Sequence, residues 1–122
     1  MKKVTVFGAG NGGITAAYHF AKEGYDVCIY DFAEFPAQIK AIKEAGGITA
    51  LDEHHGYPMI LGGFEKISLA THDIEAAMKH SNLYVIVCPS FAQEKFFRDM
   101  LPFLSDESIV VTMPANYASL VF

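Results

Sequence analysis

The chain has 122 residues, the length of one domain, so residues 1–122 are expected to form a single unit. Hydrophobic residues make up 52% and charged residues 19%, which excludes an intrinsically disordered chain. Asp and Glu number 14 and Lys and Arg number 9, giving a net charge of −5 without a basic run. This balance argues against partners such as nucleic acid or an anionic membrane surface. No apolar stretch reaches the roughly 18 residues of a membrane span.

Two cysteines, Cys28 and Cys88, both fall in apolar runs. They indicate buried thiols in a reducing compartment, and we therefore expect a cytoplasmic protein without disulfides. Neither a C-x-x-C nor an H-x-x-x-H spacing occurs, so no metal site is predicted.

Strands and helices alternate along the chain, apart from a glycine-punctuated segment at 46–66. That segment predicts a small β excursion, a hairpin or a meander with apolar pieces at 48–51 and 57–61. The other predicted elements are, in chain order, a strand at 4–7, a helix at 12–23, a strand at 26–30, a helix at 34–45, a strand at 67–70, a helix at 72–80, a strand at 83–87, a helix at 91–101 and a strand at 109–113.

The ends of the predicted helices carry local signals. Asn11 and Thr71 are suited to cap the first and third helices, and Ser90 with Gln93 matches a capping box for the fourth. Pro36 falls in the first turn of the second helix, and a glycine follows its last turn.

The β–α alternation predicts an α/β fold with a parallel sheet and helices on both faces. The apolar runs at 83–87 and 109–113 predict buried strands, whereas polar alternation at 67–70 suits a sheet edge. Right-handed crossovers give the strand order 3-2-1-4-5 of a Rossmann-type, doubly wound dinucleotide-binding domain.

One glycine-rich turn, directly between the first strand and the first helix, matches G-x-G-x-x-G. Its first glycine allows a tight turn, its second leaves room for a pyrophosphate, and its last lets the helix pack closely on the strand. The N–H groups at the helix start would face the phosphates. A ligand-free turn would explain one glycine but not four. The expected cofactor contacts are Gly8, Ala9, Gly10, Asn11, Gly12 and Gly13.

Asp31 stands at the end of the second strand, 18 residues after Gly13. A carboxylate there can accept hydrogen bonds from both adenine-ribose hydroxyls and would repel a 2′-phosphate. No Arg or Lys follows before Lys40, so the pattern predicts NAD as the cofactor rather than NADP. The alternative is an exposed strand-end acid or a cap for the second helix. Phe32, its neighbour, is included in the predicted site.

Further candidates follow the fourth and fifth strands, whose ends border the same crevice. They are Cys88, Pro89, Ser90 and Asn116, expected near the nicotinamide half of the cofactor. Helix capping alone would also account for Ser90, and Asn116 could be an ordinary loop residue. No cation lies nearby in the sequence to lower the pKa of the Cys88 thiol, which favours an inert thiol.

None of the five histidines falls in a predicted strand-end loop, so no catalytic residue is predicted. His54 and His55 are adjacent, and His19, His72 and His80 fall in or beside helices. We therefore expect the isolated chain to bind NADH without catalysing a reaction.

The chain resembles the N-terminal cofactor domain of the octopine/nopaline (opine) dehydrogenase family over essentially its whole length. The residues that carry the resemblance are the run GAGNGGITAAYHFAKEGYDVCIYDF from Gly8, the Gly46-Gly47-Ile48 excursion, Thr71-His72-Asp73-Ile74, Val87-Cys88-Pro89-Ser90-Phe91 and Met113-Pro114-Ala115-Asn116. NAD-dependent glycerol-3-phosphate dehydrogenases have a similar domain, although their glycine turn usually carries a bulky residue where this chain has Gly12.

The opine resemblance implies reductive condensation of an amino acid with a 2-keto acid, using catalytic residues of a following helical domain that is absent from this chain. Gln93 stands where opine dehydrogenases often have a histidine, which leaves the amino-acid substrate open. The alternatives are the cofactor half of a glycerol-3-phosphate dehydrogenase-like enzyme or a free-standing NAD-binding module. The apolar end of the chain predicts self-association, or contact with the missing domain, through residues 103–122.

Overall fold

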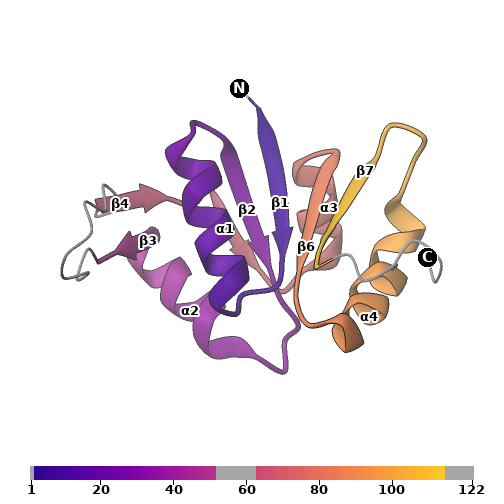
Figure 1. Cartoon of the computed structure of the whole chain (residues 1–122), viewed down its shortest axis with the longest axis horizontal. Coiled ribbons are helices and arrows are strands. Elements are labelled where there is room, and N and C mark those ends of the chain that lie inside the picture. Colours follow the sequence, from indigo (N-terminus) through magenta and orange to yellow (C-terminus); the bar gives the residue numbers. More distant parts are fainter. Residues whose placement is uncertain (1, 52–62, 115–122) are drawn as a thin grey trace.

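The computed structural model describes residues 2–51 and 63–114, which form a parallel sheet between two layers of helices (Figure 1). The strands of this sheet are β1 (Lys3–Phe7), β2 (Asp26–Tyr30), β5 (Leu69–Thr71), β6 (Leu83–Val87) and β7 (Ile109–Met113). The helices are α1 (Asn11–Lys22), α2 (Pro36–Ala45), α3 (Ile74–His80) and α4 (Ser90–Met100), and a 3-10 turn at Leu101–Phe103 follows α4.

The strands of the main sheet lie in the order β5-β2-β1-β6-β7, and every pairing is parallel. This confirms the predicted order 3-2-1-4-5, since β5 is the third strand of this sheet along the chain. The predicted excursion is also confirmed: β3 (Gly47–Ala50) and β4 (Gly63–Lys66) form a separate antiparallel pair. The apolar piece expected at 57–61 lies outside the described residues.

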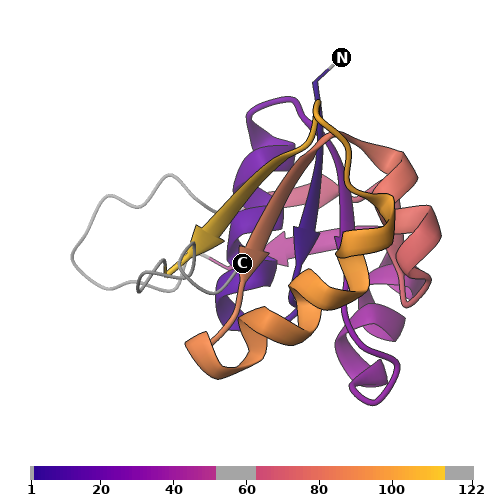
Figure 2. The same cartoon turned by 90° about the vertical axis from the view of Figure 1, so that its right-hand side faces the viewer.

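Two hydrophobic clusters pack on opposite faces of the sheet. One joins β1 and β2 to α1 and α2 and includes Val4, Val6, Ala17, Ile29 and Ile39. The other joins the same strands to α3 and α4 and includes Phe7, Tyr30, Met78, Tyr84 and Phe96. Successive strand residues point to opposite faces, so β1 and β2 contribute to both clusters. Figure 2 shows the sheet nearly edge-on, with α1 on one side and α3 and α4 on the other.

The helix starts differ from the sequence expectations. Gly10, not Asn11, is the N-cap residue of α1, and Asp73, not Thr71, caps α3 by accepting from two backbone N–H groups. Ser90 does not occupy the N-cap position that the predicted capping box requires, because α4 begins at Ser90 itself with Pro89 as its N-cap. Gln93 is buried and donates from Nε2 to the carbonyl oxygen of Pro114.

The prediction that β7 is buried is wrong. Ile109, Val111 and Met113 are 60%, 40% and 40% exposed, because β7 is the outermost strand and those three side chains occupy one face. Val110, on the other face, packs against the cluster beneath α4. Across the described parts of the chain, no helix is long and apolar enough to cross a membrane.

Candidate cofactor site

Two glycines in the turn after β1 leave no room for a side chain, and a third borders open space. Gly8 has φ of +112°, and a Cβ there would lie 2.2 Å from the carbonyl oxygen of Val87 on the neighbouring strand. A Cβ on Gly13 would lie 1.8 Å from the carbonyl oxygen of Gly8, so α1 packs directly on the turn. Around Gly10 the position of a Cβ is open, with no atom within 4 Å.

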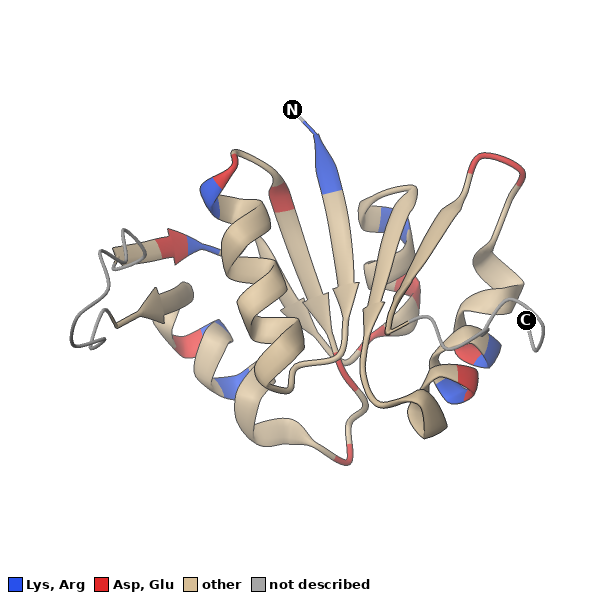
Figure 3. Ribbon diagram, viewed as in Figure 1, with Lys and Arg blue, Asp and Glu red and all other residues tan. Residues whose placement is uncertain are grey.

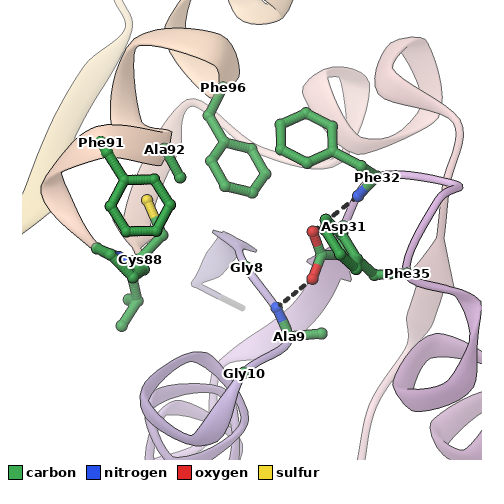
Figure 4. A pocket seen from close by; sticks show the side chains of 12 residues that line it. Gly8, Ala9, Gly10, Asp31, Phe32, Phe35, Cys88, Phe91, Ala92 and Phe96 are labelled. Carbon is green, nitrogen blue, oxygen red and sulfur yellow. Dashed lines mark hydrogen bonds between the residues drawn. The ribbon is translucent and has the colours of Figure 1, made fainter.

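A carboxylate faces this turn from the next strand. The N–H of Ala9 donates to Oδ2 of Asp31 over 3.0 Å, and the N–H of Phe32 donates to Oδ1 over 2.7 Å (Figure 4). The pairing of β1 with β2 brings these residues together, because Phe7 lies opposite Tyr30 and the N–H of Gly8 donates to the carbonyl oxygen of Tyr30. The glycine turn and the acid are therefore fixed to each other.

A histidine also lies beside the acid, which corrects the expectation that none lies in a strand-end loop. His72 directly follows β5, and its Nδ1 lies 2.9 Å from the carbonyl oxygen of Asp31. A carbonyl oxygen only accepts, so Nδ1 carries the hydrogen. His19 is exposed on α1, His80 bonds the carbonyl oxygen of Asp26 at the opposite end of β2, and His54 and His55 lie outside the described residues.

An open cavity of about 260 Å³ lies between the turn after β2 and the start of α4. Figure 4 shows the side chains of Phe32 and Phe35 on one side of it and those of Phe91 and Phe96 on the other. Phe91 is 89% exposed and Phe35 is 55% exposed, whereas Phe32 and Phe96 are buried. The complete lining is Gly8, Ala9, Gly10, Asp31, Phe32, Phe35, Val87, Cys88, Pro89, Phe91, Ala92 and Phe96.

A second open cavity, of about 380 Å³, continues from the first along the carboxyl ends of β6 and β7. The two cavities share Gly10, Val87, Cys88 and Pro89. The lining of the second is completed by Asn11, Gly12, Met113 and Pro114. Together they form a groove that crosses the sheet at β1, where the direction of strand progression reverses, which is the usual ligand position in an open parallel sheet.

Most of the predicted site residues meet in this groove. Five of the six turn residues, all but Gly13, line one or both cavities together with Asp31, Phe32, Cys88 and Pro89. Gly13 packs against the backbone of Gly8 in the turn, and Ser90 begins α4 without lining either cavity. Asn116 lies outside the described residues. Sequence reasoning missed Val87, Phe35, Phe91, Ala92, Phe96 and Met113 as lining residues.

The thiol of Cys88 is held in its protonated form. Burial, with a smaller contribution from the negative charge of Asp31, raises the pKa of Cys88 to about 11. Burial likewise raises the pKa of Cys28, which lies on β2, to about 12. Thiols with raised pKa values are poor nucleophiles and poor metal ligands at neutral pH. Within the described ranges, no group of three or more His, Cys, Asp or Glu side chains is placed to hold a metal ion.

The glycine turn, the strand-end acid and the groove between them define a dinucleotide-binding domain of the Rossmann type. Comparisons with known proteins agree. The family described as NAD-dependent glycerol-3-phosphate dehydrogenase N-terminus matches residues 3–114. The chain therefore belongs to that family, and the cofactor that this membership assigns is NAD. The resemblance to opine and glycerol-3-phosphate dehydrogenases seen in the sequence is confirmed.

Curated relatives come from both enzyme groups. An opine dehydrogenase from Arthrobacter sp. (strain 1C) is 29% identical over 93% of this chain and 29% of its own length. A glycerol-3-phosphate dehydrogenase from Thioalkalivibrio sulfidiphilus is 29% identical over 88% of this chain and 30% of its own length. An octopine dehydrogenase structure with NADH and L-arginine aligns with a TM-score of 0.76 and 25% identity, over 94% of this chain and 29% of that one. The chain thus spans about 30% of the length of these relatives.

Proposed function

We propose that this chain is the NAD(H)-binding domain of an opine-type dehydrogenase, an enzyme that reductively condenses an amino acid with a 2-keto acid. The observation that carries the proposal is the 3.0 Å hydrogen bond from the N–H of Ala9 to Asp31. It fixes a glycine turn and a carboxylate side by side on the wall of one open groove.

The first cavity would hold the adenosine half of the cofactor. The carboxylate of Asp31 would accept hydrogen bonds from the ribose hydroxyls. The exposed rings of Phe35 and Phe91 stand on opposite sides of the cavity and offer apolar faces to a purine base. Phe96 is buried in the core beneath and supports the cavity floor.

The second cavity would receive the pyrophosphate and the nicotinamide half. Gly10 leaves open space beside the start of α1, where the first N–H groups of a helix lack intrahelical partners and attract an anion. Cys88, Pro89 and the Met113–Pro114 end of β7 would border the nicotinamide ring. When bound, NADH supplies the hydride of the reaction. These residues would bind and orient it, and Ser90 and Asn116 are proposed as neighbours on the same side.

Two observations favour the opine class over the glycerol-3-phosphate class. The octopine dehydrogenase structure aligns with a TM-score of 0.76, against 0.66 for a glycerol-3-phosphate dehydrogenase from Coxiella burnetii. A Cβ on Gly12 would already lie 3.0 Å from Cγ1 of Val87, so a bulky side chain there would need to displace Val87 or enter the second cavity. The family match over residues 3–114 favours the second candidate, the cofactor half of a glycerol-3-phosphate dehydrogenase-like enzyme.

Calorimetric titration with NADH tests the binding site, with Gly10→Val as the diagnostic variant. The added side chain would occupy the open space next to the helix start and abolish binding. Gly10 has φ of −79° and ψ of −171°, a conformation that valine adopts readily, so the variant should remain folded. Circular dichroism provides that control. A folded Gly10→Val chain that binds NADH as the unmodified chain does would refute the site.

An activity assay tests the enzyme class. We expect the 122 residues alone to leave NADH unoxidised with pyruvate plus amino acids and with dihydroxyacetone phosphate, because residues of a following domain would complete the reaction site. Without that positioning, the reaction loses a lowering of its activation barrier that can reach about 7–11 kcal/mol. The full natural product of the gene should oxidise NADH with a keto acid and an amino acid. Turnover with the triose phosphate instead would favour the second candidate, and a natural product that ends at residue 122 would favour a free-standing binding module.

We place the enzyme in the cytoplasm, since both cysteines are free thiols.

A further inference from the structure

An ion pair links α4 to the turn after β2, the two segments on either side of the first cavity, and neither of its residues lines that cavity. The ammonium group of Lys95 on α4 contacts Oε1 of Glu34, which lies in the turn after β2. These residues are 61 positions apart in the chain. Figure 3 marks acidic positions in that turn and adjacent acidic and basic positions along α4. Both side chains are more than half exposed, so the pair can open without disturbing the core.

The ammonium group of Lys95 also lies over an aromatic ring. Its Nζ lies 4.1 Å from the centroid of the Phe32 ring. Phe96 stacks on the same ring with centroids 4.2 Å apart and an interplanar angle of 20°, which leaves no room for an ammonium group between them. The ammonium group therefore covers the opposite face of Phe32. Phe32 directly follows Asp31 and lines the cavity, so Lys95 is a cation beside the proposed ribose site.

The sequence pattern considered only the basic residues that follow Asp31 along the chain, and Lys95 is a cation that this pattern does not include. Lys40 is the next basic residue in the sequence, but the fold places Lys95 of α4 over the ring of Phe32, the residue after Asp31. The charged groups beside Phe32 thus include the carboxylates of Asp31 and Glu34 and the ammonium group of Lys95. A phosphate on the ribose 2′-oxygen would meet both carboxylates, while Glu34 neutralises the group that could otherwise bind it.

We propose that Glu34 is a specificity-determining residue for the cofactor. By holding Lys95 in an ion pair against Phe32, it withholds that ammonium group from a 2′-phosphate. Glu34 and Asp31 together then favour NADH over NADPH. This inference rests on the proposed function, because it assumes that the adenine ribose lies beside Asp31. Glu34 itself lines neither cavity and would contact NADH only weakly.

The experiment measures dissociation constants of NADH and NADPH for four variants by cofactor fluorescence. Glu34→Gln should strengthen NADPH binding about two- to fivefold, the upper part of the range expected for an exposed ion pair. NADH binding should change less than about twofold. Lys95→Gln should weaken NADPH more than NADH, because Glu34 is left unpaired. The double variant should return to within about twofold of the unmodified chain for NADPH.

Glu75→Gln is the matched control, since it removes the same charge from another exposed Glu–Lys pair, on α3. It should change neither affinity. The gain in Glu34→Gln should also shrink as salt is raised, because exposed charges are screened. Equal effects of Glu34→Gln on both cofactors, or a gain that survives in the double variant, would overturn the inference. If the unmodified chain fails to bind NADH at all, the proposed function itself fails, which is a distinct result.

Discussion

Asp31 has an accepting capacity that matches the proposed ligand. An ionised carboxylate offers about four lone-pair positions. The N–H groups of Ala9 and Phe32 take one position on each oxygen, which leaves about two for outside donors. The two hydroxyl groups of a ribose would fill that number. The carboxylate is therefore oriented before a ligand arrives, and little conformational freedom remains to be lost on binding.

Replacing Asp31 by alanine should weaken NADH binding by about 1.5–3 kcal/mol, the contribution of hydrogen bonds to a charged group. NADPH should lose less, because the same change removes repulsion of the 2′-phosphate. Asp73→Ala is the matched control: it removes an acid that caps α3 and lines neither cavity. Dissociation constants for both cofactors decide the outcome. An unmodified chain that binds NADPH as tightly as NADH would contradict the assignment.

The glycine geometry could be predicted from the sequence because it is local. A glycine pattern between a strand and a helix specifies where side chains are excluded, and the close contacts of Gly8 and Gly13 follow that pattern. The contact of Lys95 with Glu34 could not be predicted in this way. It depends on how α4 packs beside the turn after β2, and no periodicity reports a contact between residues 61 positions apart.

At the scale of elements, whether a segment forms a strand or a helix was easier to predict than how deeply it is buried or at which residue it begins. The run at 109–113 is apolar, but an apolar run does not indicate how many strands will lie beside it, and therefore does not fix how deeply it is buried. β7 has β6 as its partner, and its exposed face includes Val111. Likewise, Ser90 and Gln93 have the residue types of a capping box, but the helix begins one residue earlier than the box requires, with Pro89 at the N-cap position.

The contact between α1 and the glycine turn gives a test of stability. Gly13→Ala should lower the melting temperature by about 10 °C or more, because the new Cβ would overlap the carbonyl oxygen of Gly8 in a close-packed contact. Gly12→Ala is the matched control on the same helix. Its Cβ would meet one side-chain atom of Val87 at 3.0 Å, and the better helix propensity of alanine offsets that contact. Thermal unfolding measures both, and equal melting temperatures would contradict the packing argument.

At the scale of the whole molecule, the exposed outer strand predicts association. Ile109, Val111 and Met113 present apolar side chains beside the outer edge of β7, which pairs with no other strand of the described residues, and such edges tend to pair. We expect the isolated chain to self-associate through residues 103–122, or, under the proposed function, to bind a following domain there. Val111→Lys should raise the monomer fraction in light scattering, whereas Thr49→Lys on β3 should not. A chain that stays monomeric at high concentration, with no dye-accessible apolar surface, would refute this expectation.

The register between β1 and β2 limits how the chain length can vary. Phe7 lies opposite Tyr30, and the next residues along each strand bring the glycine turn to Asp31. Because side chains alternate between the two faces of a strand, one residue inserted into β2 would turn the acid away from the turn. Natural insertions and deletions should therefore be absent from β2 itself, so the number of paired residues that lead up to Asp31 is as much a part of the site as the identity of the acid.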